Sequence, residues 1–172
     1  MKLLIPAELI LRLQPELRRG GRKEIGGVLV GEHVERSIFR IVDLSVQHTG
    51  GTAVHFVRDE KQSKVFLEKF FERVGNDYQR FNYIGEWHSH PSFEPFPSGE
   101  DHATMRQIVS DPTVGVNFAI LIIATLAPRS MLKLSATAYR ASGDPIEIDV
   151  QIEGELPKKR GLIQWVTDLF RS

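Results

Sequence analysis

The sequence contains no cysteine, has no net charge and lacks an apolar run long enough to cross a bilayer. Without thiols the chain cannot form disulfides, thiolate zinc sites, thiolate-held iron–sulfur clusters or a cysteine nucleophile. Its 22 lysines and arginines balance 22 aspartates and glutamates, so we expect neither nucleic acid nor a membrane as a partner. The longest apolar stretch, residues 116–127, is interpreted as a buried strand.

The remaining composition is that of an ordinary globular protein. At about 150 residues per domain, 172 residues predict one domain, and 41% hydrophobic residues suffice for its core. Pro6 and Glu8 interrupt the apolar start before a secretory signal core could form, so a cytoplasmic location is expected. We place the domain at residues 1–153.

Residues 154–172 differ in character from the domain before them. Lys158, Lys159 and Arg160 make a basic linker. An amphipathic helix is predicted after it, with an apolar stripe of Leu162, Ile163, Val166, Leu169 and Phe170. We expect this helix to dock on its own domain; docking on a partner is the alternative.

Hydrophobic periodicity divides the domain into strands and helices. A first helix follows Pro6 and is ended or kinked by Pro15, a second begins at Asp59, and a third begins at Ser98. Strands are predicted over residues 25–31, 37–46, 53–57, 83–90, 116–126, 131–139 and 146–152. This alternation predicts an α/β fold in which helices flank a mixed sheet.

The one dense group of ligand-type residues is His88-Ser89-His90-Pro91, followed by Ser98 and Asp101. Residues two apart in a strand face the same side, so both imidazoles can reach one metal ion. Two histidines and one aspartate leave a fourth position open for water, as a catalytic zinc site requires. Such chemistry also needs a carboxylate base; the choices are Glu24, Glu86, Glu94 and Glu100.

Each part of this pattern has a simpler interpretation. Two neighbouring histidines are common on surfaces, and Ser98 with Asp101 could form only a helix cap. The metal interpretation rests on their occurring together. The other histidines show no such grouping and are treated as ordinary polar residues, with His102 at the edge of the site: His33, His48, His55 and His102.

Several other zinc and phosphate motifs are excluded. The chain has no His-Glu-x-x-His helix, no Pro-Cys-x-x-Cys segment of the zinc deaminases and no Lys-Ser/Thr after Gly26-Gly27-x-x-x-Gly31. His88-x-His90 followed by Glu94 is similar to the first cupin motif, but a convincing second motif is missing.

Two segments resemble one known family, the JAMM (MPN-plus) zinc metalloproteases. His88-Ser89-His90-Pro91, six residues and Ser98-Gly99-Glu100-Asp101 resemble its signature, and Glu24 before the glycine-rich segment 25–31 resembles its second hallmark. The resemblance covers residues 3–139, and Asn82–Pro97 is most similar to the prokaryotic deubiquitinase-like branch. It implies an MPN-like, cytidine-deaminase-like fold.

The resemblance also implies the roles of individual residues. His88, His90 and Asp101 would bind Zn²⁺, Glu24 would be the general base, and Ser98 would hydrogen-bond the oxyanion. The family's choice of Glu24 does not follow from spacing. The loop Ser92–Pro97 is a candidate for gripping an extended substrate tail, or simply packs as a proline-rich loop.

The expected function is therefore a zinc-dependent isopeptidase or peptidase acting after the C-terminal tail of a ubiquitin-like protein. By analogy we expect a bacterial conjugation pathway with an antiviral role, and E1-like and E2-like enzymes from the same operon as partners. Two alternatives stay open at this point. One is a non-catalytic MPN scaffold that binds proteins, and the other is a zinc hydrolase of small amides or peptides.

Overall fold

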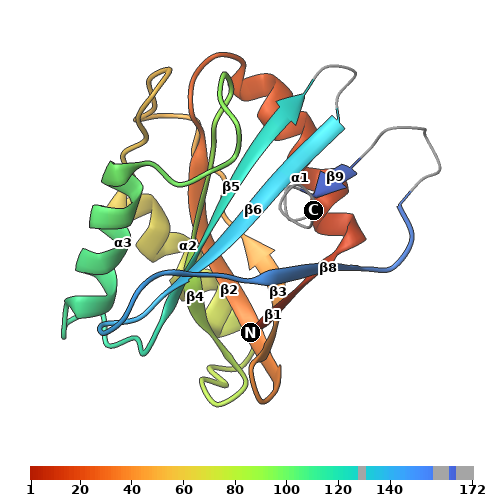
Figure 1. Cartoon of the computed structure of the whole chain (residues 1–172). Coiled ribbons are helices and arrows are strands. Elements are labelled where there is room, and N and C mark those ends of the chain that lie inside the picture. Colours follow the sequence, from red (N-terminus) through yellow and green to blue (C-terminus); the bar gives the residue numbers. More distant parts are fainter. Residues whose placement is uncertain (128–130, 157–162, 166–172) are drawn as a thin grey trace.

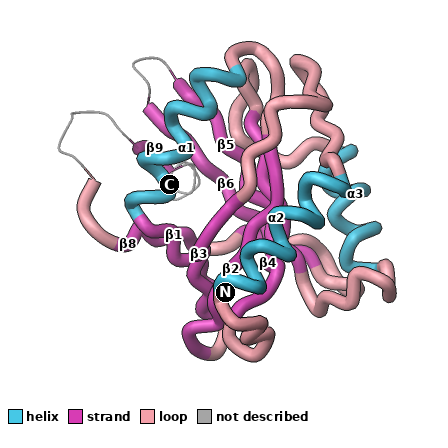
Figure 2. The backbone as a smooth tube through the Cα atoms, turned by 180° about the vertical axis from the view of Figure 1, so that it is seen from behind, coloured by secondary structure: helices cyan, strands magenta, loops and turns pink. Residues whose placement is uncertain are grey.

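The protein folds around one mixed β-sheet with helices on both of its faces (Figures 1 and 2). The computed structural model describes residues 1–127, 131–156 and 163–165. The helices are α1 (Ala7–Gly20), α2 (Glu60–Arg73) and α3 (Gly99–Ser110). The strands are β1 (Lys2–Pro6), β2 (Gly26–Glu35), β3 (Ile38–Leu44), β4 (Phe81–Ser89), β5 (Ala119–Ala127), β6 (Met131–Tyr139), β7 (Ile146–Glu147), β8 (Asp149–Glu153) and β9 (Ile163–Trp165).

The strand order is β7-β6-β5-β4-β2-β3-β1-β8, with β9 also pairing with β6. Antiparallel hairpins β2–β3 and β5–β6 alternate with parallel pairs, among them β4–β5 and β1–β8. Between β7 and β8, Ile148 donates its N–H to the carbonyl of Ala136 at 3.0 Å, so this segment links the two ends of the sheet. The predicted α/β class, a mixed sheet flanked by helices, is confirmed.

The two faces of β5 show how the layers are built. Alternate residues of a strand point to opposite faces. Ile120, Ile122 and Ala124 join the core beneath α1, whereas Ala119, Leu121 and Ile123 pack with Met105 and Val109 of α3. The central strands are therefore buried on both sides, and α3 is held on the face opposite α1.

None of the described helices is long and apolar enough to span a membrane.

Three local predictions differ from the structure. The first helix does not end at Pro15 but continues to Gly20, because burial of Leu17 beyond the proline stabilises its last turn. The strand predicted over residues 53–57 is wrong: apart from the isolated bridge Gly51–Phe56 this segment is irregular, and Val54 is 66% exposed. Strand β1 was not predicted, since its short apolar run has no clear alternation.

The C-terminal region is described only in part. For residues 163–165, where the sequence predicts part of an amphipathic helix, the structure has strand β9, parallel to Leu132–Leu134 of β6. The basic cluster of residues 158–160 and the rest of the predicted helix lie outside the described residues.

An ion-pair cluster around Asp43 joins two helices to the end of β3. Its carboxylate accepts hydrogen bonds from Arg12 of α1 at 2.6 Å and Arg73 of α2 at 2.8 Å, and from the N–H of Leu44. Burial opposes ionisation, but the hydrogen bonds from Arg73 and Arg12 outweigh it and hold the pKa of Asp43 below its usual value.

We expect Asp43→Asn to lower the free energy of unfolding by about 1 kcal/mol at neutral pH, because both arginines are substantially exposed and screened. A lowered native pKa stabilises the fold above the unfolded pKa of about 3.9 and loses its effect below it. Urea unfolding of both proteins should therefore show a difference that shrinks as pH falls through about 4. A difference that does not change with pH would contradict this.

Candidate metal centre

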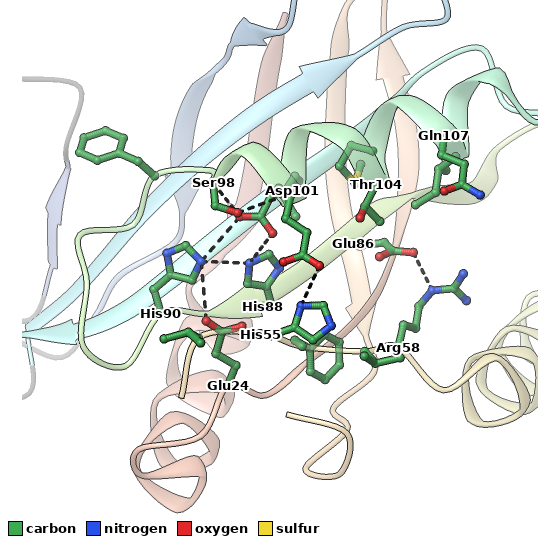
Figure 3. Close-up of a pocket in the computed structure, with 18 of the residues that line it drawn as sticks. Glu24, His55, Arg58, Glu86, His88, His90, Ser98, Asp101, Thr104 and Gln107 are labelled. Carbon is green, nitrogen blue, oxygen red and sulfur yellow. Dashed lines mark hydrogen bonds and ion pairs between the residues drawn. The ribbon is translucent and has the colours of Figure 1, made fainter. Parts of the chain in front are cut away.

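Four side chains from three elements meet at the C-terminal end of β4 (Figure 3). His88 Nε2 lies 3.2 Å from His90 Nε2 and 3.3 Å from Asp101 Oδ1. His90 Nε2 lies 3.8 Å from Asp101 Oδ2 and 4.0 Å from Glu24 Oε1. The four side chains are between 4% and 16% exposed, so the structure brings the predicted ligands and the predicted base together in a largely buried place.

A bulge at Gly85 shifts the alternation of β4, so that Ile84 before it and Trp87 after it both join the core. Leu29 of β2 is opposite Gly85 while Val30 is opposite Tyr83, so one residue of β4 is extra. Gly85 has φ of +145°, and a Cβ there would collide with the backbone of Ile120. After the bulge, Trp87 joins the core beneath α1, and the alternate residues His88 and His90 face α3.

Glu24 is held beside the histidines by backbone contacts on both sides. The N–H of Ile25 donates to Ser89 Oγ at 3.0 Å, and the N–H of Ser89 donates to the carbonyl of Ile25 at 2.8 Å. The N–H of Glu24 donates to the carbonyl oxygen of Thr52 at 2.7 Å. A Cβ on Gly26 would lie 2.5 Å from the carbonyl oxygen of Trp87, so only a glycine at this position allows the backbone of β4 to approach so closely.

Asp101 is positioned by the start of α3. Ser98 Oγ accepts the N–H of Asp101 at 3.2 Å, and Asp101 Oδ2 accepts the N–H of Ser98 at 2.7 Å, which completes a capping box. The capping interpretation is therefore correct, and it is compatible with ligation because Oδ1 still faces His88. One residue further, His102 Nδ1 lies 2.8 Å from the hydroxyl of Tyr139, which joins α3 to β6.

The pKa values of the two carboxylates of the site shift in opposite directions. Burial, with a smaller effect of Asp101, raises the pKa of Glu24 despite the opposing effect of His88. Burial also opposes ionisation of Asp101, but His88 and the capping N–H of Ser98 hold the pKa of Asp101 well below its usual range. Burial lowers the pKa of His90, which favours the neutral imidazole that binds metals.

Two of the three distances between the predicted ligand atoms are close to those of a tetrahedral metal site. With bonds of about 2.0–2.2 Å, neighbouring ligand atoms of such a site lie roughly 3.3–3.6 Å apart. The His88–His90 distance of 3.2 Å and the His88–Asp101 distance of 3.3 Å are close to this range. The His90–Asp101 distance of 3.8 Å, which involves the other carboxylate oxygen, and the Glu24–His90 distance of 4.0 Å are longer. Glu24 with both histidines is a second possible group, its donor atoms lying within 4.8 Å of one another.

The site opens into a groove of about 760 Å³ between α3 and the irregular segment before α2. Sequence reasoning missed most of its wall. His55, treated as an ordinary polar residue, lines the groove 3.2 Å from Glu100, and the ring of Phe56 stacks near His88. Arg58 and Glu86 form an ion pair of 2.7 Å at its far end (Figure 3). These residues come from separate segments that the fold places side by side, so their spacing in the sequence does not predict that they share a groove.

Comparison with known proteins shows the family to which the sequence is similar. Residues 6–139 match the family described as prokaryotic homologs of the JAB domain. A CD-NTase/cGAS isopeptidase of Enterobacter hormaechei is 27% identical over 85% of this chain and 79% of that protein. The Vibrio cholerae protein of the same name is 35% identical over 53% of this chain and 58% of its own length. This chain thus spans less than two thirds of the Vibrio protein.

More distant proteins extend the likeness. COP9 signalosome complex subunit 5 of Caenorhabditis elegans is 27% identical over 79% of this chain and 36% of its own length. The solution structure of protein DSY2949 from Desulfitobacterium hafniense has a TM-score of 0.67 at 17% identity, covers 90% of this chain and 94% of its own, and supports the fold. With the family match extending over residues 6–139, the chain belongs to the prokaryotic homologs of the JAB domain, within the JAMM (MPN-plus) metalloproteases.

Proposed function

We propose that this metalloprotease is a zinc-dependent isopeptidase that separates a conjugated protein from its target. One observation carries the proposal: the nitrogens of His88 and His90 lie 3.2 Å apart and an Asp101 oxygen lies 3.3 Å from His88, close to tetrahedral spacing, with a second carboxylate 4.0 Å from His90. His88, His90 and Asp101 would hold the ion. A bound Zn²⁺ supplies Lewis acidity and lowers the pKa of its water to about 7.

The residues around the ion would carry the proton and the developing charge. Glu24, buried and with a raised pKa, accepts a proton from the attacking water and returns it to the leaving amine. Ser98 Oγ already accepts the N–H of Asp101, so its own hydrogen remains available for the oxyanion of the tetrahedral intermediate.

The name of the bacterial relatives bears on the conjugated protein. Both are called CD-NTase/cGAS isopeptidases, which favours a CD-NTase or cGAS-like protein as one partner in the cleaved bond. Alternatively, the conjugated protein is a ubiquitin-like protein that is attached to its target through its C-terminal tail. In either case we propose a cytoplasmic, antiviral conjugation pathway with E1-like and E2-like enzymes. Exposed Phe93 and Phe96, which line the groove, would contact the extended tail.

The test uses the full chain and three substrates: a tail peptide linked to a lysine ε-amine, the same tail linked to an α-amine, and acetyl-lysine. We expect the isopeptide to be cleaved, the activity to be lost with 1,10-phenanthroline, and zinc to restore it. Cleavage of the α-linked tail would indicate precursor processing. Cleavage of acetyl-lysine alone, or activity that resists the chelator, would contradict the proposal.

A further inference from the structure

Strand β4 contributes a carboxylate to the groove that the mechanism above does not use. Glu86 precedes His88 by two residues, so both side chains lie on the same face of the strand. The rise of about 3.3 Å per residue separates their Cα atoms by roughly 7 Å. An extended substrate chain advances by the same amount in two residues, so a side chain near the cleaved bond comes within reach of Glu86.

The contacts of Glu86 leave one oxygen available. Its side chain is only 12% exposed. Arg58 Nε lies 2.7 Å from Oε1, and the hydroxyl of Tyr83 donates to the same oxygen at 3.4 Å. Oε2 accepts no hydrogen bond from any residue in the described ranges, and Glu86 lines the groove. A nearly buried carboxylate with one oxygen unused by the protein is suited to accept a donor from a ligand.

The surrounding charges favour a cationic donor. Apart from the four residues at the ion site and Glu94, which pairs with Lys133, the charged groups that line the groove are four carboxylates and one guanidinium, and His55 lies 3.2 Å from one of these carboxylates, that of Glu100. The carboxylates are Glu60, Glu86, Glu100 and Asp111, and the guanidinium is that of Arg58. The wall also includes aliphatic side chains that can cover the stem of a long cationic residue: Val57, Ile108 and Val114.

We propose that Glu86 is a specificity determinant that receives an arginine or lysine side chain located within three residues of the cleaved bond. This inference rests on the proposed isopeptidase function, because the cation must belong to a substrate chain whose cleaved bond lies at the ion site beside His88. Arg58 holds Oε1 and leaves Oε2 for the substrate, and its own charge weakens the attraction for a second cation.

The experiment measures binding as well as cleavage. The probes are quenched fluorogenic alanine–glycine peptides that carry one arginine, moved one position at a time, with citrulline at the same position as the neutral control. Dissociation constants are measured by anisotropy with zinc-loaded Glu24→Gln protein, and kcat/KM is measured with the wild type. Mass spectrometry of the products gives the distance from the arginine to the cleaved bond.

We expect arginine to be preferred over citrulline by about tenfold at one position, as for a charged hydrogen bond of low exposure. Glu86→Gln should reduce the ratio of the arginine and citrulline dissociation constants to about one. The dissociation constants of the citrulline peptides should not change. Arg58→Gln should retain or increase the ratio, since it removes the competing cation. If Glu86 only anchored Arg58, both variants would lower the ratio alike. Glu68→Gln, on the exposed face of α2, is the matched control.

Three results would overturn the inference. One is equal binding of arginine and citrulline at every position. Another is the same loss of ratio in Glu86→Gln and Arg58→Gln, and the third is an arginine preference more than three residues from the cleaved bond. If no peptide is cleaved but the arginine preference in binding depends on Glu86, the cation site stands, and the isopeptidase proposal is decided separately by the lysine ε-amine substrate.

Discussion

Replacing Glu24 with glutamine is expected to abolish cleavage and leave zinc bound. Glutamine has the same shape and preserves the backbone hydrogen bonds that hold this position, but its amide cannot accept a proton from water. Proton transfer by a positioned side chain contributes typically about 10²–10⁴-fold to rate. We therefore expect kcat on the lysine isopeptide substrate to fall by at least about a hundredfold. Two quantities are measured for the wild type and the variant: the rate of single-turnover cleavage, and the zinc content by mass spectrometry.

The same variant separates two possible ligand sets. If Glu24 were the third ligand with His88 and His90, Glu24→Gln would lose zinc together with activity. Retained zinc with lost activity assigns it to proton transfer, and retained zinc with full activity would show that the base lies elsewhere. Glu68→Gln on the surface of α2 controls for the loss of one charge and should behave as wild type.

The part of the site that could be predicted depends on local geometry. The two-residue spacing of His88 and His90 places both on one strand face, and Ser98 with Asp101 follows the pattern of a capped helix start. Both patterns depend on residues within one turn or one strand step, where backbone geometry decides what side chains face. The mixed sheet followed in the same way from strands of alternating and continuous apolar character.

The rest of the site depends on contacts between distant segments. Four glutamates were open as the base, and Glu24 was preferred from the family resemblance alone. In the structure, the pairing of Gly26 with His88 and the contacts between Ile25 and Ser89 place Glu24 beside the histidines. Residues 53–57, which include His55 and Phe56, were predicted to form a strand, whereas in the structure residues 54–58 line the groove one after another.

Replacing Asp101 with asparagine is expected to remove zinc from the protein. The asparagine carbonyl can still accept the N–H of Ser98, so the start of α3 keeps its cap, but the charged oxygen that faces His88 is lost. Mutating even an outer partner of a metal ligand typically costs about 10–100-fold in affinity. For a ligand itself we expect zinc affinity to fall by more than about a hundredfold, with activity lost in parallel.

Thermal unfolding gives an independent measure of the same prediction. Zinc at 100 times its dissociation constant stabilises a protein that binds it only when folded by about 2.7 kcal/mol. Added zinc should therefore raise the Tm of the wild type and of Glu24→Gln, and leave Asp101→Asn unchanged. Glu100→Gln, which alters the neighbouring, exposed residue of the same helical turn, should respond as wild type. A zinc-induced rise in Asp101→Asn together with none in Glu24→Gln would transfer the ligand role to Glu24, because the two carboxylates share the same histidines.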